Sequence, residues 1–382
     1  MNSIFLKTNI VYGTGSRMQI SSEFRSLKCK RVMIVTDKGI VRARLLDDIL
    51  RCLEKDGIYY TLFDEVVPDP DIECVTKAKN HYIEHQCDGI LAVGGGSSID
   101  TAKGAGILIK CKDAPLMSFV GIDKFSTAIP PFIAVPTTCG TGSEVTNVTV
   151  ITDEQHAKLP ISSKYLIPDV AVLDPELLYS LPSEIVAATG MDALTHAVEA
   201  LTNKNDNWYA EACALKAIRM IRENIRPAVL EQDKQALASL LYASTLAGIA
   251  FSIARLGLVH AMSHPVSGWA KVPHGLANAI LLPYILRFNL EANPQVHALF
   301  AREFGIKDKG DDLKTAIAGA EAVEQLNEQL GIPKTFSEIG VDAKLIPQMI
   351  VDTFKSGNVK INAREVTEED VKRIYEQAFS LK

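Results

Sequence analysis

The sequence lacks clustered cysteines, a basic tract, an internal repeat and any low-complexity segment. Its seven cysteines are scattered along 382 residues without a Cys-x-x-Cys pair, which indicates reduced thiols in a cytoplasmic protein. A net charge of −6 without a run of basic residues argues against nucleic acid or an anionic membrane as a partner. The first residues also lack the hydrophobic region of a secretory signal, so we expect cytoplasmic localisation.

Long hydrophobic runs are nearly absent as well. The exception is residues 237–254, an uncharged stretch that reaches the lower length limit of a membrane span. The stretch is rich in Ala, Ser, Thr and Gly, and a charge follows at once at Arg255. We therefore expect a buried helix of a helical domain, and no association with a membrane.

Strand and helix patterns alternate in the first half of the chain. This alternation predicts a parallel sheet with helices on both faces, and such sheets bind ligands at the carboxyl ends of their strands. We predict strands at 31–36, 59–63, 88–93, 131–136, 148–152 and 169–173, and helices at 41–55, 72–85 and 98–110.

Only helical periodicity follows Pro175 and Pro182, which mark a boundary between the two patterns. The expected fold class is therefore α/β plus all-α, with an α/β domain at 1–180 and a helical domain at 181–382. Helices are predicted in the second domain at 184–202, 207–225, 233–253, 259–269 and 277–291.

Candidate metal ligands gather in the second domain. Asp192 and His196 are four residues apart, so a helix presents them on one face, where a carboxylate and an imidazole can hold a divalent metal together. Such a pair needs at least one further protein ligand, and His260, His264 and His274 follow in two blocks. The spacing alone does not decide which of these three histidines complete the site.

Two polar loops of the first domain follow predicted strands. Gly94-Gly95-Gly96-Ser97 leaves an apolar strand and opens a helix, whose free N–H groups and dipole bind a pyrophosphate. A second loop, residues 137–144, follows the next strand, and two adjacent loops of this kind form a dinucleotide cleft. Asp37 ends another strand, where an acidic residue accepts hydrogen bonds from a ribose and repels a 2′-phosphate.

These motifs together resemble the iron-containing (group III) alcohol dehydrogenases. The matching stretches are Gly-Gly-Gly-Ser at 94–97, Thr-Thr-Cys-Gly-Thr-Gly-Ser-Glu at 137–144, Gly-Met-Asp-Ala-Leu-Thr-His-Ala at 190–197, Leu-Val-His-Ala-Met-Ser-His-Pro at 258–265 and Pro-His-Gly at 273–275. The resemblance extends from about residue 5 to the end. It implies a dinucleotide-binding Rossmann-like domain followed by an all-helical metal-binding domain, in the dehydroquinate synthase-like architecture.

The resemblance also assigns roles to single residues. It implies four metal ligands, with His264 near the substrate but not on the metal, and a site with all five ligands would leave little room for substrate. His264 is the candidate for the catalytic proton relay, because imidazole titrates near pH 7. The implied ligands are Asp192, His196, His260 and His274. The implied dinucleotide contacts are Asp37, Gly95, Gly96, Ser97, Asp100, Thr137, Thr138, Thr141, Ser143, Lys158 and Leu178. The implied apolar substrate wall is Val148, Phe251 and Leu256.

The expected reaction is hydride transfer between NAD(H) and a small, largely uncharged primary alcohol or aldehyde, such as a short-chain alcohol or diol. One divalent metal is expected as a Lewis acid; the ligands suit Fe²⁺, Zn²⁺ or Mn²⁺, and the resemblance favours Fe²⁺. We also expect a homodimer or higher homo-oligomer. The chain departs from the family pattern at Ile253, Arg255, Ser267 and Lys271. Strict selectivity for an anionic substrate would implicate Arg255 or Lys271.

Three other functions fit part of the pattern. A lyase of the dehydroquinate synthase type also holds NAD and a metal, but it needs several basic side chains for its acidic substrate. A glycerol or hydroxy-acid dehydrogenase would use the same reaction on another substrate. A non-catalytic NAD-binding protein would leave the Asp-His cluster without an evident structural purpose. Sustained turnover of NADH with an aldehyde would exclude the lyase.

Overall fold

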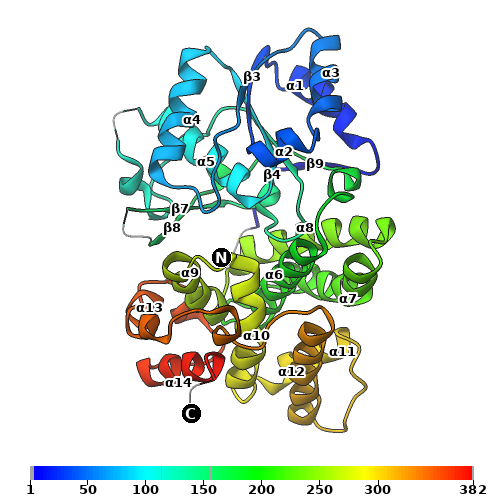
Figure 1. Ribbon diagram of the computed structural model, residues 1–382, viewed down its shortest axis with the longest axis vertical. Coiled ribbons are helices and arrows are strands. Elements are labelled where there is room, and N and C mark those ends of the chain that lie inside the picture. The colour runs from blue at the N-terminus through cyan, green and yellow to red at the C-terminus, as the bar shows by residue number, and fades with distance from the viewer. Residues whose placement is uncertain (1–3, 113, 155–156, 381–382) are drawn as a thin grey trace. The chain divides into compact units, whose positions relative to one another are not determined.

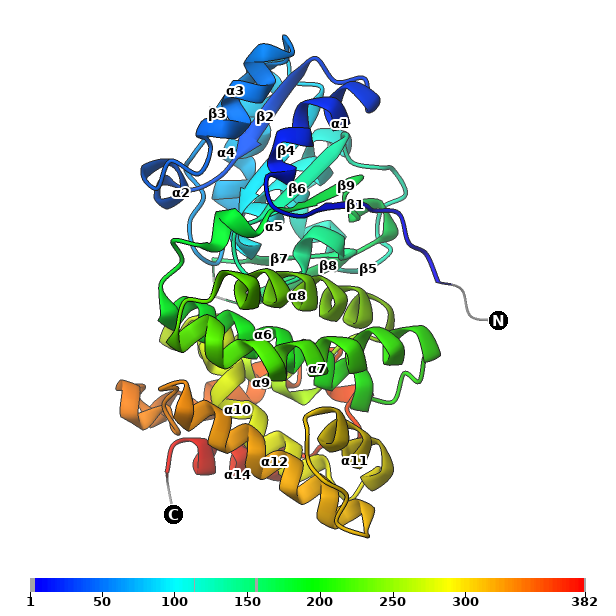
Figure 2. The same cartoon turned by 90° about the vertical axis from the view of Figure 1, so that its right-hand side faces the viewer.

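A computed structural model describes residues 4–112, 114–154 and 157–380 of the chain. The chain divides into two compact units, Met1–Leu181 and Pro182–Lys382. Strands and helices alternate in the first unit, and the described part of the second contains only helices and loops (Figure 1 and Figure 2). A parallel sheet followed by a helical remainder confirms the expected fold class.

The first unit is built on a six-stranded sheet whose neighbouring strands are all parallel, in the order β1-β9-β6-β4-β2-β3. Its central strands are buried apolar runs, as in other sheets that helices cover on both faces. These strands are β1 (Asn9–Tyr12), β2 (Arg31–Val35), β3 (Tyr59–Phe63), β4 (Gly89–Gly94), β6 (Phe132–Pro136) and β9 (Val170–Leu173). A smaller sheet contains β5 (Gly121–Ile122), β7 (Val148–Thr152) and β8 (Lys158–Ser162), with β7 antiparallel to β8.

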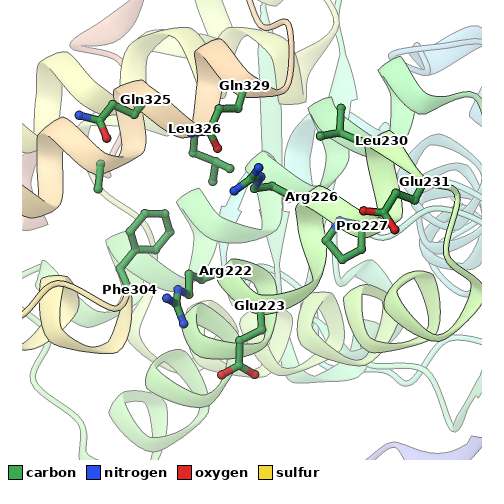
Figure 3. Close-up of a pocket in the computed structure, with 11 residues that line it drawn as sticks. Arg222, Glu223, Arg226, Pro227, Leu230, Glu231, Phe304, Gln325, Leu326 and Gln329 are labelled. Atoms are coloured by element: carbon green, nitrogen blue, oxygen red, sulfur yellow. The ribbon is translucent and has the colours of Figure 1, made fainter.

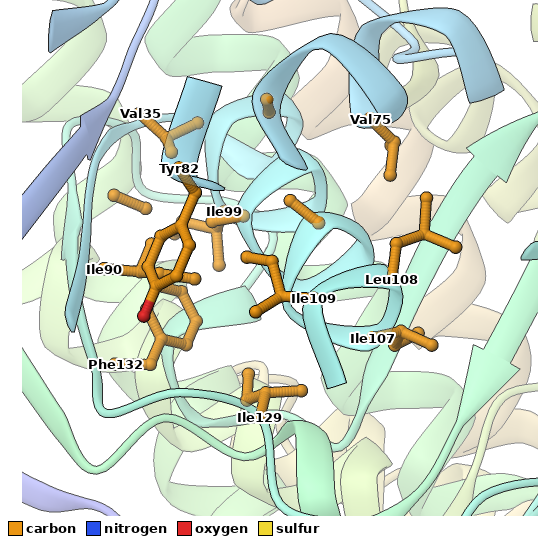
Figure 4. Packing of buried hydrophobic residues seen from close by; sticks show 14 of the residues in the cluster. Val35, Val75, Tyr82, Ile90, Ile99, Ile107, Leu108, Ile109, Ile129 and Phe132 are labelled. Carbon is orange, nitrogen blue, oxygen red and sulfur yellow. The ribbon is translucent and has the colours of Figure 1, made fainter. Parts of the chain in front are cut away.

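Two helices, α4 (Ile72–Glu84) and α5 (Gly96–Lys110), pack on one face of the parallel sheet (Figure 4). Ile99 of α5 belongs to the same buried cluster as Ile90 and Phe132 of the strands, and all three side chains are fully buried. Burial of each such side chain stabilises the fold by about 1.5–3 kcal/mol relative to exposure. The other helices of this unit are α1 (Ile20–Ser26), α2 (Lys38–Arg42) and α3 (Asp47–Lys55).

The strand order reverses beside β2, because the chain passes from β2 to β3 on one side and returns to β4 on the other. The carboxyl ends of β2 and β4 therefore border the crevice in which sheets of this type hold ligands. The Thr36 hydroxyl donates a hydrogen bond to the Val93 carbonyl at 2.7 Å and joins these two strand ends. The topology thus brings Asp37, after β2, to the same edge as Gly94, at the end of β4.

One predicted helix differs from the structure. The single helix expected at 41–55 is two, α2 and α3, because Arg44 adopts a left-handed backbone with a φ of 58° that no α-helix continues through. Strands β1, β5 and β8 are absent from the predicted set. Strands β1 and β5 have only four and two residues, and β5 and β8 pair within the smaller sheet rather than with the apolar core strands.

A buried lysine ties α5 to the segment that follows β6. The ammonium of Lys103 is fully buried. It donates hydrogen bonds to the carbonyls of Ser143, Thr146 and Val148 at 2.7–3.0 Å. Burial lowers the pKa of Lys103 to about 8, while the nearby charge of Asp100 acts in the opposite direction. One cation therefore gathers the three carbonyls that shape this segment.

The second unit is organised around three long helices that pack against one another, α6 (Ser183–Thr202), α7 (Trp208–Leu230) and α8 (Lys234–Ala254). The remaining helices are α9 (Leu258–Ala270), α10 (His274–Asn289), α11 (Pro294–Glu303), α12 (Asp312–Gln329), α13 (Ile346–Thr353) and α14 (Glu368–Ala378). Short 3₁₀ helices occur in both units at Ser16–Gln19, Leu116–Phe119, Ser143–Val145, Lys164–Leu166, Pro175–Leu178, Ser337–Ile339, Ala343–Leu345 and Val359–Ile361.

Helix α8 is long and apolar enough, by length and composition alone, to cross a membrane. More than half of it is nevertheless buried. Leu237, Leu240 and Leu241 have no exposed surface, and the helix packs on α6 and α7. This arrangement matches the buried helix expected for residues 237–254.

Candidate metal centre and cofactor loops

Helix α6 carries two of the candidate ligands into the interior of the second unit. Residues 190–200 of this helix are all buried, so other elements surround it on every side. Asp192 and His196 lie one turn apart on it, as their spacing predicts, and Glu199 lies almost one turn further along.

Three imidazoles surround one carboxylate oxygen. Asp192 Oδ1 lies 3.8 Å from His196 Nε2. It also lies 3.9 Å from Nε2 of both His260 and His274. These separations are too long for hydrogen bonds, but they approach the spacing of about 3.4 Å between two atoms that each bind one tetrahedral ion at ~2.1 Å. Ligand atoms of Asp192, His260 and His274 all lie within 4.8 Å of one another, so these three residues could hold one ion.

The contacts of the Asn278 side chain indicate what kind of partner this cluster fits. Asn278 Nδ2 donates a hydrogen bond to Asp192 Oδ1 at 2.6 Å. The same nitrogen lies 3.1 Å from Nε2 of both His260 and His274. The Oδ1 of Asn278 is buried and has no hydrogen-bond partner among the described residues. Three atoms that each carry a lone pair thus converge on one point. Such a set of ligand atoms fits a divalent cation as its common partner.

A buried glutamate fixes the ring of His260. Glu199 Oε2 accepts a hydrogen bond from His260 Nδ1 at 2.6 Å, so the lone pair of Nε2 points toward Asp192. Glu199 Oε1 accepts the Val259 N–H, also at 2.6 Å. Burial raises the pKa of Glu199 to about 8, against the lowering effect of the backbone N–H groups. Burial and the neighbouring histidines keep the pKa of His260 well below its usual value, which favours the neutral ring that coordinates metals.

His196 is held by stacking on both sides. Its ring lies 4.5 Å from the ring of Phe251 and 4.6 Å from that of His260, with interplanar angles of 25° and 23°. The group of ligand atoms within 4.8 Å of one another does not include His196, which contacts the cluster through Asp192 and through the stacking on His260. Phe251 also belongs to the expected substrate wall, with Leu256 in the turn after α8.

His264 lies one turn after His260 on α9. Its ring is nearly perpendicular to that of His260, at a centroid distance of 6.0 Å and an angle of 88°. Its centroid lies 5.2 Å from that of His274. His264 is partly exposed, and its nitrogens lie outside the group that contains Asp192. The residue therefore borders the cluster.

Gly275 lets α10 begin directly against α6. A Cβ at this position would lie 2.5 Å from the Ala188 carbonyl oxygen and 3.2 Å from the Cβ of Asp192. Only glycine fits such an approach of two backbones. The close approach brings His274, the preceding residue, within reach of Asp192.

In the first unit, the glycine loop after β4 lies against the threonine loop after β6. A Cβ on Gly96 would lie 2.7 Å from the Thr141 side chain, and one on Gly95 would lie 3.3 Å from Thr138. Among the described residues, no side chain caps the first turn of α5, so its N–H groups remain available to an anion. The loops fit a pyrophosphate, because they combine partly exposed glycines with an uncapped helix start.

Asp37 lies beside the glycine loop, as the strand order predicts. Its Oδ1 caps α2 by accepting the N–H groups of Gly39 at 2.6 Å and Ile40 at 3.1 Å. A Cβ on Gly94 would lie 3.8 Å from its other oxygen, Oδ2. The described residues donate no hydrogen bond to Oδ2, which leaves this oxygen for the hydroxyls of a ribose.

Two residues expected to contact the dinucleotide, Asp100 and Ser143, instead form hydrogen bonds within the protein that hold the loops in place. Asp100 accepts hydrogen bonds from the Ser143 hydroxyl at 2.7 Å and from the Val150 N–H at 2.9 Å. Lys103 also contacts the Ser143 hydroxyl, at 3.2 Å. Both carboxylate oxygens of Asp100 are therefore engaged within the protein.

Three further residues expected to contact the dinucleotide, and one residue of the expected substrate wall, have different surroundings. Lys158 forms an ion pair with Asp69 and is nearly buried. Leu178 is fully buried at the end of the 3₁₀ helix Pro175–Leu178. Thr137 is buried and donates its N–H to the Gly94 carbonyl at 3.0 Å. The third residue of the expected substrate wall, Val148, is partly exposed at the start of β7.

Three residues that shape these sites are absent from the sequence-based set, namely Glu199, Asn278 and Lys103. Glu199 follows His196 by three positions and Asn278 follows His274 by four, so each shares a helix face with a ligand. That spacing is the signal that could have found them. Lys103 carries no such signal, because its acceptors lie 40 to 45 residues away in the sequence.

A pocket of about 540 Å³ in the second unit lies between α7 and α12 and contains none of the expected site residues (Figure 3). Arg222 and Arg226 line it from α7, and Gln325 lines it from α12. Glutamates of the same wall balance the charge of the arginines. The pocket is therefore separate from the metal and cofactor residues.

Comparison with known proteins covers nearly the whole chain. Residues 7–175 match the family described as iron-containing alcohol dehydrogenase, and residues 186–379 match the C-terminal part of that family. The chain is 39% identical to 1,3-propanediol dehydrogenase from Klebsiella pneumoniae, over 99% of this chain and 97% of that protein. It is 33% identical to NAD-dependent methanol dehydrogenase from Bacillus methanolicus, over 99% and 100% of the two chains. A crystal structure of a 1,3-propanediol oxidoreductase superposes with a TM-score of 0.96 and 38% identity, covering 99% of this chain and 100% of the other.

At a pH above the Glu199 pKa of about 8, Glu199→Gln should weaken the binding of a divalent metal by roughly 10- to 100-fold, because an amide cannot supply the charge that orients and polarises the His260 ring. A competition titration against a chelating dye measures the affinity on purified protein. Glu184→Gln, at the exposed first turn of α6, is the matched control and should keep the wild-type affinity. Equal affinities of the two variants would contradict the role of Glu199.

Proposed function

This chain belongs to the iron-containing alcohol dehydrogenase family, and on that premise we propose that it transfers a hydride between NAD(H) and a small primary alcohol or its aldehyde. Membership of the family confirms the resemblance of the sequence motifs. The observation that carries the proposal is the convergence of Asp192, His260 and His274 on one buried point, with His264 beside it. Buried polar groups of this kind are costly unless they find a partner.

The metal site is the first part of the proposal. We assign Asp192, His260 and His274 as ligands together with His196, and Fe²⁺ as the ion, although the same donors also suit Zn²⁺ or Mn²⁺. When bound, the ion supplies a Lewis acid that polarises the substrate oxygen. His274 is the ligand with an exposed edge, at 28% of its side chain against 2–6% for the other three, so we place the entry of substrate on its side.

The proposed catalytic residue is His264. During aldehyde reduction its imidazolium donates a proton toward the substrate oxygen, and during alcohol oxidation its neutral ring accepts that proton. Its position supports this role, since its ring lies next to His274 on the exposed edge of the cluster. Partial exposure lets the ring exchange the proton with water.

The dinucleotide site is assigned to the first unit. Bound NAD(H) supplies the hydride donor or acceptor of the reaction. Its proposed contacts are Asp37, Gly95, Gly96, Ser97, Asp100, Thr137, Thr138, Thr141, Ser143, Lys158 and Leu178. The loops around α5 would hold the pyrophosphate, and Asp37 would select NAD(H) over NADP(H) by repelling a 2′-phosphate. Apolar contacts to a short substrate are assigned to Val148, Phe251 and Leu256.

We also propose that the protein is a cytoplasmic homo-oligomer. All seven cysteines are free thiols, which suits a reducing compartment. Strand β1 is an edge of the parallel sheet, and Phe5, Leu6 and Tyr12 on or before it are more than half exposed. An exposed apolar edge favours pairing with a second copy. A light-scattering mass of one chain at micromolar concentration would contradict the oligomer.

Activity and metal content measured on one preparation test the function. The protein should consume NADH and a proton with a small aldehyde such as propanal and form one equivalent each of alcohol and NAD⁺. Net consumption of NADH also excludes a lyase that regenerates its cofactor. A chelator should abolish turnover, and Fe²⁺ should restore it. Full activity of metal-free protein would refute the proposal.

Asp37→Gly should raise the ratio of kcat/KM for NADPH to that for NADH by about tenfold, which corresponds to about 1.4 kcal/mol of relieved repulsion. Asp37→Asn is the matched control for folding, because asparagine keeps the cap on α2 and removes only the charge. Both variants should shift the ratio in the same direction. A wild-type enzyme that already used NADPH as well as NADH would show that Asp37 does not face the 2′ position.

His264→Ala should keep its metal and its fold while kcat falls by roughly 10²-fold, because the proton relay is lost. His196→Ala, by comparison, should lose both metal and turnover. Metal analysis and kcat are measured on the same samples. Loss of metal from His264→Ala would instead make this residue a ligand.

A further inference from the structure

Arg255 occupies the turn between two elements of the metal centre. Phe251, one turn earlier on α8, stacks on His196. Helix α9, which carries His260, begins three residues after Arg255 at Leu258. The turn therefore adjoins the candidate substrate wall, because Leu256 of that wall is the next residue.

The backbone of Arg255 is strained. Its φ of 70° and ψ of −169° lie in a region that is essentially restricted to glycine. Hydrogen bonds on both sides hold this conformation, because the Arg255 N–H donates to the Phe251 carbonyl at 2.7 Å and Asn203 Nδ2 donates to the Arg255 carbonyl at 3.0 Å. Asn203 and Asn205 also donate to the Ala254 carbonyl, each at 3.0 Å. Glycine would adopt this conformation without strain, so the presence of arginine indicates that its side chain has a function.

The guanidinium of Arg255 has no ion pair or hydrogen bond to any residue that the structure describes. It is partly buried and lies against Gly357, where a Cβ would sit 3.1 Å from Nη2. By contrast, the largely buried Arg17 of the first unit pairs with three carboxylates, including Asp174. The Arg255 guanidinium therefore offers five N–H donors in a partly buried position. Such a group can bind a carboxylate, which accepts two parallel hydrogen bonds from a guanidinium.

We propose that Arg255 binds a carboxylate at the far end of the substrate, so that short ω-oxo acids are better substrates than neutral aldehydes. This inference rests on the proposed function, which places the aldehyde group at the metal centre. Phe251 would then contact the methylene groups between the two ends of the substrate. The inference replaces the uncharged substrate expected from the sequence with an anionic one.

Steady-state reduction with NADH tests this selectivity. The oxo acids 4-oxobutanoate and 5-oxopentanoate are compared with butanal and pentanal, which have the same numbers of carbons and no charge. The wild type should prefer at least one oxo acid by about tenfold or more in kcat/KM. Arg255→Met should remove that preference chiefly through KM, and it should leave the neutral aldehydes within about twofold.

The control for net charge is Arg226→Met, because Arg226 is an exposed arginine of α7 that lines a different pocket. This variant should keep the wild-type preference. A wild type that prefers the neutral aldehydes, or equal effects of the two variants on all four substrates, would overturn the assignment of Arg255. Absence of turnover with every aldehyde would instead refute the proposed function, and binding then decides the role of Arg255.

Binding is measured without turnover by thermal unfolding in glutarate, a dicarboxylate that cannot react. Glutarate should raise the Tm of the wild type and of Arg226→Met, but not of Arg255→Gly. Glycine also relieves the strained backbone, so Arg255→Gly should have a Tm equal to or above that of the wild type without ligand. A purely structural arginine would give the opposite result, with a lower Tm in Arg255→Gly and the same response to glutarate in all three proteins.

Discussion

The burial of one carboxylate among imidazoles is the constraint on which the second unit depends. Asp192 is almost fully buried, and burial raises its pKa while the charge of His196 lowers it. Among the described residues, Asn278 supplies the hydrogen bond to this carboxylate, and it leaves its own carbonyl unpaired in doing so. The packing of α10 on both α6 and α9 holds the acceptors together, and a cation would complete their coordination. Folding and metal affinity are therefore coupled in this unit.

The first unit shows the reverse arrangement, in which a buried cation gathers acceptors. Lys103 binds the carbonyls of Ser143, Thr146 and Val148, and Asp100 holds the Ser143 hydroxyl from the same helix. The threonine loop after β6 is consequently attached to α5, whose uncapped start follows the glycine loop. The two loops that we assign to the dinucleotide thus share one support. Their relative position is set before a cofactor arrives.

Periodicity and spacing predict what is local, and this covers most of the fold. The apolar runs of the sheet and the helices around Asp192 and His196 follow from patterns within single elements, which is why the two-part architecture could be predicted. The features that could not be predicted from the sequence depend on tertiary contacts or on the backbone conformation of a single residue. The break at Arg44 and the strained turn at Arg255 have no residue pattern that marks them. Lys103 lies in an apolar helix, and nothing local indicates that distant carbonyls would surround its ammonium.

Gly275 also limits how a lineage with this fold can diverge. Any missense change at this position adds a side chain whose first carbon would meet the Ala188 carbonyl at 2.5 Å. Helix α10 would then shift and carry His274 away from Asp192. Substitutions at position 275 are therefore not tolerated as long as the protein needs its metal, whatever the substrate. The turn that contains Arg255 holds a side chain in spite of its strained backbone, so descendants with new specificities are expected to differ there while the contact between α6 and α10 stays unchanged.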